Sequence, residues 1–163
     1  MSSSASSAAS ALPGAPFVAY GAGQLQVEQV KLSELAQQHG TPLFVYSQAS
    51  ILAALAAYQR GLAGRNALIC YAMKANSSLA ILRLLADAGC GFDIVSVGEL
   101  ERALAAGATP SKIIFSGMGK TDAELAFALA LPDLQINVES TPEFDRLCAL
   151  ARARAVRPLV VLR

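Results

Sequence analysis

One lysine of the sequence stands where a primary amine could do chemistry. Lys74 lies in the run YAMKAN, Tyr71 to Asn76, directly after a β-favouring stretch. If the strand continues to it, alternation places Lys74 on the same face as Cys70 and Ala72, at the carboxyl end of the strand. Burial and close neighbours would there favour the neutral amine, which can form a Schiff base with a carbonyl group. The competing interpretation is a solvated lysine that merely ends a strand.

Three further charged residues, Asp93, Glu99 and Arg163, lie near the predicted ends of strands. Asp93 interrupts an otherwise apolar strand, where an unpaired buried carboxylate is costly, so we expect a positive partner such as Lys74 or Arg163. Glu99 fits two roles equally well, an active-site acid or the partner of Ser96 at the start of a helix. Arg163 is the last residue of the sequence and could simply be exposed.

The other candidate motifs favour structural roles. SGMGKT, Ser116 to Thr121, is not a phosphate-binding P-loop, because Ile114 stands where that motif needs its first glycine. His39 precedes the turn at Gly40 and is interpreted as an exposed residue at the end of a helix. The three cysteines form neither a disulfide framework nor a zinc motif. We therefore expect no metal site, a packing role for Cys70, and a reducing, cytoplasmic compartment.

Regular elements must position these residues. From Ala67 onward, β-rich runs alternate with amphipathic helices, and predicted strands begin near residues 68, 92, 112, 134 and 158. Such even spacing favours parallel strands joined by helices, as in a (β/α)8 barrel. Because only about five strands are found, we expect residues 47–163 to be the amino-terminal part of a longer, truncated barrel.

Three S/T-x-x-E pairs support this division of the chain. In each pair the hydroxyl and the carboxylate can satisfy free backbone N–H groups at the start of a helix. The pairs are Ser96 with Glu99, Thr121 with Glu124, and Ser140 with Glu143.

The residues before the barrel predict a tail and a small β domain. Residues 1–16, rich in serine and alanine, are expected to be a disordered tail. Residues 17–46 are expected to contribute to a β domain. The predicted elements are strands at Phe17–Tyr20, Leu25–Val30 and Pro42–Ser47, a helix capped by Ser33 and ended by Gly40, and a helix from Ser47 to about Arg60.

Composition narrows the class of partner. Thirteen Lys and Arg against twelve Asp and Glu give a net charge of +1, which offers no basis for electrostatic binding to nucleic acid or to a membrane surface. No apolar run reaches the roughly 20 residues that span a bilayer. A small-molecule partner is therefore favoured.

Several motifs, taken in order, resemble the pyridoxal-phosphate-dependent decarboxylases of the alanine-racemase-like barrel class. They are GTPLFVYS, YAMKAN, the segment from Gly91 to Thr121, INVES and the terminal VVLR. The similarity covers most of residues 40–163 and is greatest to the branch that acts on meso-diaminopimelate. It implies that Lys74 binds pyridoxal 5'-phosphate covalently, that Asp93 and Arg163 lie at the cofactor site, and that Glu99 matches a glutamate of the family.

The resemblance also implies a reaction and an assembly. The reaction is α-decarboxylation of an amino-acid substrate, meso-2,6-diaminoheptanedioate, to L-lysine and carbon dioxide, in a homodimer. Because the family's other functional residues fall beyond Arg163, residues 1–163 alone are expected to be inactive. Two alternatives share the motifs: a decarboxylase of ornithine, arginine or a carboxylated polyamine, and a non-catalytic pyridoxal-binding barrel. The β-rich segment before Gly40 argues against the second.

Overall fold

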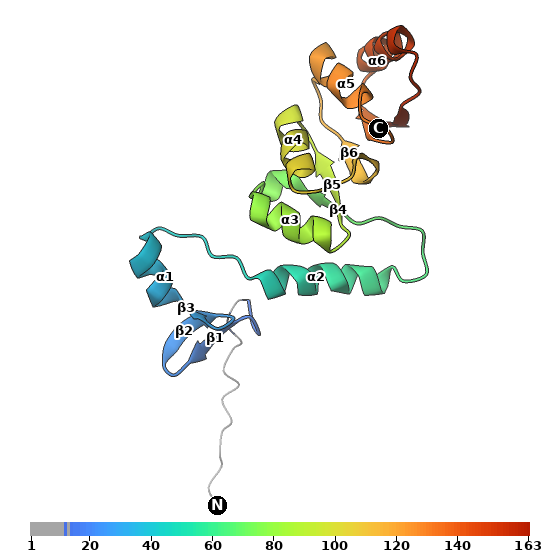
Figure 1. Cartoon of the computed structure of the whole chain (residues 1–163). Helices are drawn as coiled ribbons and strands as arrows, with labels where there is room; N and C mark the ends of the chain where they lie inside the picture. The colour runs from blue at the N-terminus through green and yellow to red at the C-terminus, as the bar shows by residue number, and fades with distance from the viewer. Residues whose placement is uncertain (1–11, 13) are drawn as a thin grey trace, which may run out of the picture. The chain divides into compact units, whose positions relative to one another are not determined.

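The computed structural model describes residues 12 and 14–163 and divides into two units, one up to Ala57 and one from Tyr58 onward (Figure 1). Most of the predicted disordered tail, residues 1–11 and 13, lies outside the described residues. Within the described part of the chain, no helix is both long enough and apolar enough to cross a bilayer.

The first unit is built on a small antiparallel sheet. Strands β1 (Val18–Gly21) and β2 (Gln24–Val27) lie at two of the predicted strands and pair as an antiparallel hairpin, with Val18 opposite Val27. A third strand, β3 (Val30–Lys31), pairs with β2 and was not expected from the sequence. The predicted strand at Leu25–Val30 is therefore interrupted by a turn at residues 28–29, and its last residue belongs to β3.

Helix α1 (Leu32–His39) follows β3 without a loop. Because the helix begins at Leu32, its cap position is Lys31, and the prediction that Ser33 caps it is wrong. Gly40 ends the helix as predicted, with a positive φ of 79° that L residues rarely adopt. His39 is the exposed last residue of the helix, as expected.

The predicted strand at Pro42–Ser47 does not form among the described residues. Residues 43–46 run without a strand partner, and the side chain of Phe44 is 87% exposed. An apolar run becomes a strand only where another backbone accepts its hydrogen bonds, and β3 supplies only two residues. The predicted helix that follows is confirmed as α2 (Gln48–Gly61).

The second unit is a five-stranded parallel sheet whose strands lie side by side in chain order. Each pair of consecutive strands is joined through a helix, which confirms the predicted alternation and the partial-barrel fold class (Figure 1). The strands are β4 (Cys70–Ala72), β5 (Gly91–Ile94), β6 (Ile113–Phe115), β7 (Gln135–Val138) and β8 (Leu159–Leu162). The helices are α3 (Leu79–Asp87), α4 (Val97–Ala105), α5 (Asp122–Leu129) and α6 (Thr141–Arg154).

The two faces of this sheet differ in character. One face is buried with the helices and is almost wholly apolar; its side chains are Phe92, Ile94, Ile113, Phe115, Ile136 and Val138. Strand register places Asp93 on the opposite face, beside Ala72 on β4 and Ile114 on β6. This second face is less buried, so it is the face that can meet a ligand.

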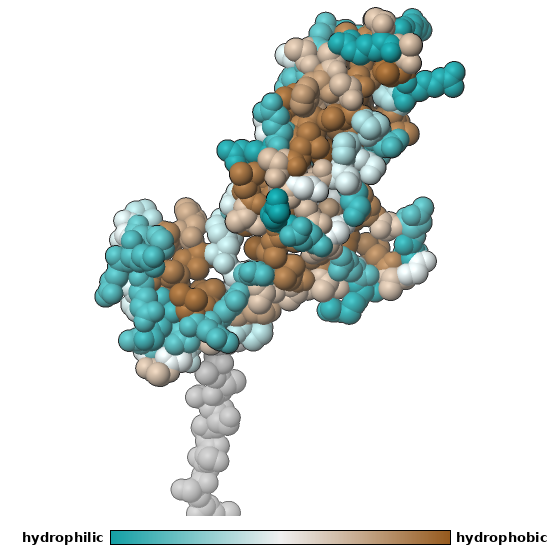
Figure 2. Space-filling view, viewed as in Figure 1, coloured by the Kyte–Doolittle hydropathy of each residue, from teal (hydrophilic) through white to brown (hydrophobic). Residues whose placement is uncertain are grey.

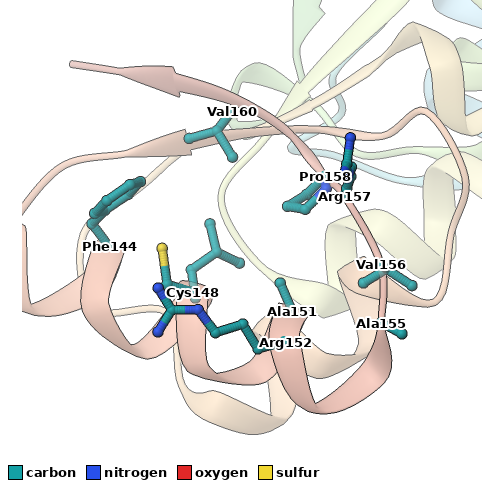
Figure 3. Close-up of a pocket in the computed structure, with 10 residues that line it drawn as sticks. Phe144, Cys148, Ala151, Arg152, Ala155, Val156, Arg157, Pro158 and Val160 are labelled. Carbon is teal, nitrogen blue, oxygen red and sulfur yellow. The ribbon is translucent and has the colours of Figure 1, made fainter.

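Apolar side chains remain exposed around β8, the last strand of the sheet. Figure 2 shows apolar patches between polar side chains on the surface of the second unit. Between β8 and α6 lies a groove of about 490 Å³, lined by Phe144, Cys148 and Val160 among others (Figure 3). No strand of the described residues pairs with the outer edge of β8.

One of the three predicted capping pairs differs from the other two. Thr121 and Glu124 form the full reciprocal box. Ser96 and Ser140 cap α4 and α6 as predicted, but their glutamate partners do not bond back to the cap residue. The carboxylates instead accept from the amide one residue earlier: Glu99 from Val95 at 2.7 Å, and Glu143 from Glu139 at 3.2 Å. Each glutamate thereby fixes the residue that directly follows the preceding strand, Val95 after β5 and Glu139 after β7.

Candidate active site

Lys74 lies at the carboxyl end of β4, but not on the strand itself. The strand ends at Ala72, and a short 3-10 helix, Met73–Ala75, carries Lys74. The fully buried side chain of Met73 anchors this turn, and the hydroxyl of Tyr71 donates to the carbonyl of Asn76 at 3.1 Å. The predicted alternation through Lys74 is therefore wrong, because the backbone changes conformation one residue before it.

The amine of Lys74 is not engaged by any other residue that the structure describes. The residue is exposed and makes no hydrogen bond or ion pair with any described residue. We expected low-dielectric surroundings for Lys74, but its side chain is exposed. The five strands form an open sheet, and the carboxyl end of β4 is left uncovered.

The other three lysines of the sequence are all engaged. Lys31 forms an ion pair with Glu34 at 2.9 Å, and Lys112 donates to the carbonyl of Gly89 at 3.2 Å. Lys120 is buried and makes three hydrogen bonds. Lys74 is thus the lysine whose amine is left available for a ligand.

Asp93 lies on β5, next to the strand that leads to Lys74. Its carboxylate accepts a 2.6 Å hydrogen bond from the hydroxyl of Ser116, at the end of β6. The expectation of a cationic partner, Lys74 or Arg163, is therefore wrong for the described residues. A half-buried carboxylate needs less compensation than a fully buried one, and a hydroxyl donor supplies it.

A row of hydrogen-bonded side chains extends from Asp93 across the sheet. The amide of Asn137 donates to the Ser116 hydroxyl at 3.0 Å, and the amide of Gln135 donates to Asn137 at 3.0 Å. These four residues, Asp93, Ser116, Asn137 and Gln135, are called the polar row below. It joins three neighbouring strands on the less buried face.

Cys70 lies at the beginning of β4, at the other end of this face. Burial raises the pKa of its thiol, and the nearby Cys90 thiol and Asp93 carboxylate raise it further. The thiol is thereby held protonated at neutral pH, which suits the packing role expected for it.

Glu99 follows β5 and belongs to the start of α4. Its amide donates to Ser96 at 3.2 Å, while its carboxylate accepts from Val95. Of the two roles considered for Glu99, the structural one is therefore observed.

Arg163 lies at the end of β8 and pairs with Glu139, which directly follows β7. The Nη1–Oε1 distance is 3.5 Å, and the side chains are 67% and 16% exposed, respectively. The same Glu139 oxygen accepts from the amide of Gly117 at 2.9 Å. Arg163 is thus brought to the carboxyl end of the sheet, as Lys74 is, but its partner is Glu139 and not Asp93.

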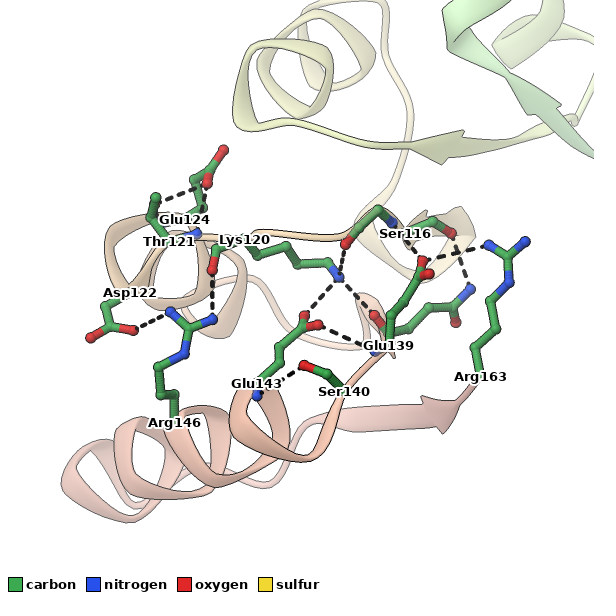
Figure 4. A network of polar contacts seen from close by, with 12 residues as sticks. Ser116, Lys120, Thr121, Asp122, Glu124, Glu139, Ser140, Glu143, Arg146 and Arg163 are labelled. Carbon is green, nitrogen blue, oxygen red and sulfur yellow. Dashed lines mark hydrogen bonds and ion pairs between the residues drawn. The ribbon is translucent and has the colours of Figure 1, made fainter.

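A buried ion pair that sequence analysis missed lies next to Glu139 (Figure 4). Lys120 and Glu143 approach to 2.7 Å and are each 3% exposed. Their positions were visible only as SGMGKT and as a capping pair, and nothing in either motif indicates a contact between residues 23 positions apart.

The exposed amine of Lys74 fits a cofactor that carries an aldehyde. Covalent attachment of an aldehyde needs an accessible primary amine without a competing partner, and Lys74 meets that condition. The described residues contain no group of three or more His, Cys, Asp and Glu that could hold a metal ion.

Comparison with known proteins gives the family. Residues 48–163 match the model of the pyridoxal-binding domain of pyridoxal-dependent decarboxylases. The chain is 53% identical over 141 residues to a diaminopimelate decarboxylase of Vibrio cholerae, a match that covers 86% of this chain and 34% of that protein. It is 49% identical over 144 residues to a diaminopimelate decarboxylase of Pseudomonas aeruginosa, covering 88% of this chain and 35% of the relative.

A solved structure agrees with these matches. Diaminopimelate decarboxylase from Helicobacter pylori, in complex with L-lysine, superposes with a TM-score of 0.77 at 44% identity. The superposition covers 80% of this chain and 33% of that structure. The chain therefore spans about a third of the length of the relatives it matches.

Proposed function

Because the chain belongs to the pyridoxal-dependent decarboxylases, we propose that it supplies the lysine-bearing part of a diaminopimelate decarboxylase. The substrate would be meso-2,6-diaminoheptanedioate, and the products L-lysine and carbon dioxide. One observation carries the proposal: Lys74, alone among the four lysines, has no partner among the described residues and lies at the carboxyl end of a parallel strand. In barrel enzymes that end of the strands bears the chemistry.

The reaction breaks the bond between the α-carbon and its carboxylate and replaces it with a bond to a proton. The electron pair of the broken bond stays on the α-carbon, which cannot hold it alone. Pyridoxal phosphate, when bound, supplies the electron sink. The protein must hold the cofactor, orient the scissile carboxylate and deliver the proton.

Lys74 has two roles in this scheme. Its amine would hold the cofactor covalently, and in its free form the same amine could deliver a proton to the α-carbon of the substrate. The exposed position on a short turn leaves the side chain free to do both.

Asp93 and Arg163 bring opposite charges to the same end of the sheet. Asp93 is fixed by Ser116 and forms no ion pair with a described residue, so its negative charge can act on a cationic part of the bound ligand. Arg163 can act on an anionic part once it leaves Glu139, and their 3.5 Å separation is long for an ion pair. Both roles are part of the proposal.

The choice of diaminopimelate rests on the identity to enzymes of that specificity and on the relative that was crystallised with L-lysine. A decarboxylase of ornithine, arginine or a carboxylated polyamine would use the same Lys74. Carbon dioxide release from meso-diaminopimelate, compared with release from ornithine and arginine, separates these alternatives. A pyridoxal-binding protein without catalysis would release none from any of the three.

The complete protein is proposed to be a cytoplasmic homodimer. The three free cysteines suit a reducing compartment. Residues 17–46 are proposed to contribute to a small β domain, and residues 47–163 to the first part of the barrel. Since the relatives are about three times as long, we propose that turnover needs segments beyond this third, and that residues 1–163 alone produce no lysine.

The assignment of Lys74 is tested by borohydride reduction of the cofactor-loaded protein, followed by digestion and peptide mapping. The pyridoxyl label is expected on the peptide that contains Lys74 and is expected to be absent from Lys74→Ala. Lys112→Ala serves as the matched control and should keep the label, because Lys112 donates to Gly89 and lies before β6, at the opposite end of the sheet. A label on any other side chain would overturn the assignment.

A further inference from the structure

The buried pair of Lys120 and Glu143 has no place in the chemistry proposed above. All three N–H groups of the Lys120 ammonium are used: they donate to Glu143 at 2.7 Å, to the carbonyl of Gly117 at 2.7 Å and to the carbonyl of Asn137 at 2.8 Å. The ring of Phe115 lies 5.5 Å from the nitrogen. The second oxygen of Glu143 accepts from the amide of Glu139.

A buried ion pair of this kind adds little to the free energy of unfolding when compared with an apolar pair. Removing two charges from water costs several kcal/mol per ion, and a well-packed apolar pair of similar volume often serves as well. A charged pair differs from an apolar pair in that each of its hydrogen bonds holds one particular backbone group in place.

The two carbonyls held by Lys120 belong to the segments that build the polar row. Gly117 directly follows Ser116, and Asn137 is itself a member of the row. Lys120 therefore ties the backbone after β6 to the backbone of β7 at the point where their side chains meet (Figure 4).

The row in turn holds Asp93. Ser116 can donate to Asp93 at 2.6 Å only if its backbone keeps its place, and the amide of Asn137 sets the direction in which the hydroxyl proton points. A shift of either segment by a fraction of the hydrogen-bond length would leave the carboxylate free to rotate.

We propose that Lys120 and Glu143 are positioning residues for the site around Lys74, acting through Ser116 and Asn137 on the orientation of Asp93. Neither residue is proposed to bind the cofactor or the substrate, because the three donors of Lys120 and both oxygens of Glu143 already have partners. The inference rests on the proposed function, because it concerns how Asp93 is presented to a bound pyridoxal group.

The test compares Lys120→Met with Lys120→Arg in the complete, cofactor-loaded protein. Lys120→Met is expected to change the visible absorption spectrum of the bound cofactor and to lower kcat by about 10²-fold, with a much smaller change in KM. Lys120→Arg, which keeps the charge and the donors, is expected to restore part of both. Lys112→Met is the matched control, and its spectrum and kcat should equal those of the unmodified protein.

Ser116→Ala separates positioning from a general loss of packing. If Lys120 acts through Ser116, the double variant Lys120→Met/Ser116→Ala changes the spectrum and kcat no more than Ser116→Ala does alone. Additive effects, or a folded Lys120→Met with an unchanged spectrum, would overturn the proposal. If Lys120→Met does not fold, Glu143→Gln takes its place: it removes the charge but keeps an acceptor, and a spectral change in the same direction is expected.

The absorption spectrum tests the positioning role of Lys120 separately from the proposed decarboxylase function. If the unmodified protein binds the cofactor but releases no carbon dioxide from meso-diaminopimelate, the proposed function fails. The spectral comparison of Lys120→Met with Lys120→Arg still decides whether Lys120 positions the site.

Discussion

The hydroxyl of Ser116 lies 2.6 Å from the carboxylate of Asp93 and donates to it, although the two residues are 23 positions apart in the chain. They come from neighbouring parallel strands, so the register of β5 and β6 creates the contact. Because the serine donor is neutral, it orients the Asp93 carboxylate without pairing it with a positive charge. A carboxylate in that state can still respond to a cation that a ligand brings.

Ser116→Ala should lower the free energy of unfolding by about 1–3 kcal/mol, because it leaves the half-buried Asp93 and the amide of Asn137 without their shared partner. Urea denaturation of the variant and the unmodified protein measures the difference. Ser78→Ala is the matched control, since the exposed Ser78 makes no side-chain capping bond at the start of α3, and its effect should stay within about 0.5 kcal/mol. Equal losses in the two variants would contradict the role given to Ser116.

Breaking the buried ion pair from one side should cost more than removing it altogether. Lys120→Met and Glu143→Leu are each expected to lower the free energy of unfolding by about 3–5 kcal/mol, because each leaves an uncompensated buried charge. The double variant leaves none and should be more stable than either single variant. Urea denaturation of all four proteins gives the coupling directly, and simple additivity of the two losses would contradict the ion pair.

Local patterns predicted most of the second unit. The strands begin within a few residues of the expected positions, because each is an apolar run followed by a helix with its own start signal. Gly40 and Ser96 act as predicted, since helix ends are decided by residues close in sequence. The prediction for Ser33 was wrong because α1 follows β3 directly. A strand of two residues is too short to show an alternating pattern in the sequence.

The partners of the charged residues could not be predicted in the same way. Asp93, Lys120 and Arg163 each bond to residues more than 20 positions away, and only strand register brings those residues together. The spacing of Ser140 and Glu143 predicts their contact, but nothing in the sequence indicates the ion pair of Glu143 with Lys120. The strand predicted at Pro42–Ser47 was wrong for the same reason, because an apolar run says nothing about where a pairing strand lies.

The start of α5 should give the protein a pH-dependent contribution to stability. The backbone N–H of Thr121 donates to the carboxylate of Glu124 and lowers the pKa of that group below its ordinary value of 4.5. A carboxyl group with a lowered pKa in the folded state stabilises the protein above its unfolded pKa, and this contribution is lost as pH falls through the folded pKa.

The difference in unfolding free energy between the unmodified protein and Glu124→Gln should therefore be largest near neutral pH and shrink below pH 4.5. Urea denaturation at a series of pH values measures it. Glu101→Gln is the control, since the exposed Glu101 bonds to no described residue, and it should change stability by less than about 0.5 kcal/mol at neutral pH. If the difference in unfolding free energy between Glu124→Gln and the unmodified protein grew as the pH fell, the prediction would be contradicted.

Two glycine-to-alanine substitutions in the same βα unit should have opposite effects on stability. A Cβ at Gly91, the first residue of β5, would lie 2.5 Å from the carbonyl of Lys112 and 2.8 Å from the sulfur of Cys70. Gly91→Ala must therefore push β5 away from its neighbours and should lower the free energy of unfolding by about 1–3 kcal/mol. At Gly98, exposed on α4, the nearest atom lies 3.9 Å away, so alanine adds helix propensity without a clash and should raise it by about 0.4–1 kcal/mol. Thermal or urea denaturation of both variants measures the two changes in the free energy of unfolding. If Gly91→Ala also stabilised the protein, the close approach of β5 to β4 and β6, on which the position of Asp93 depends, would be wrong.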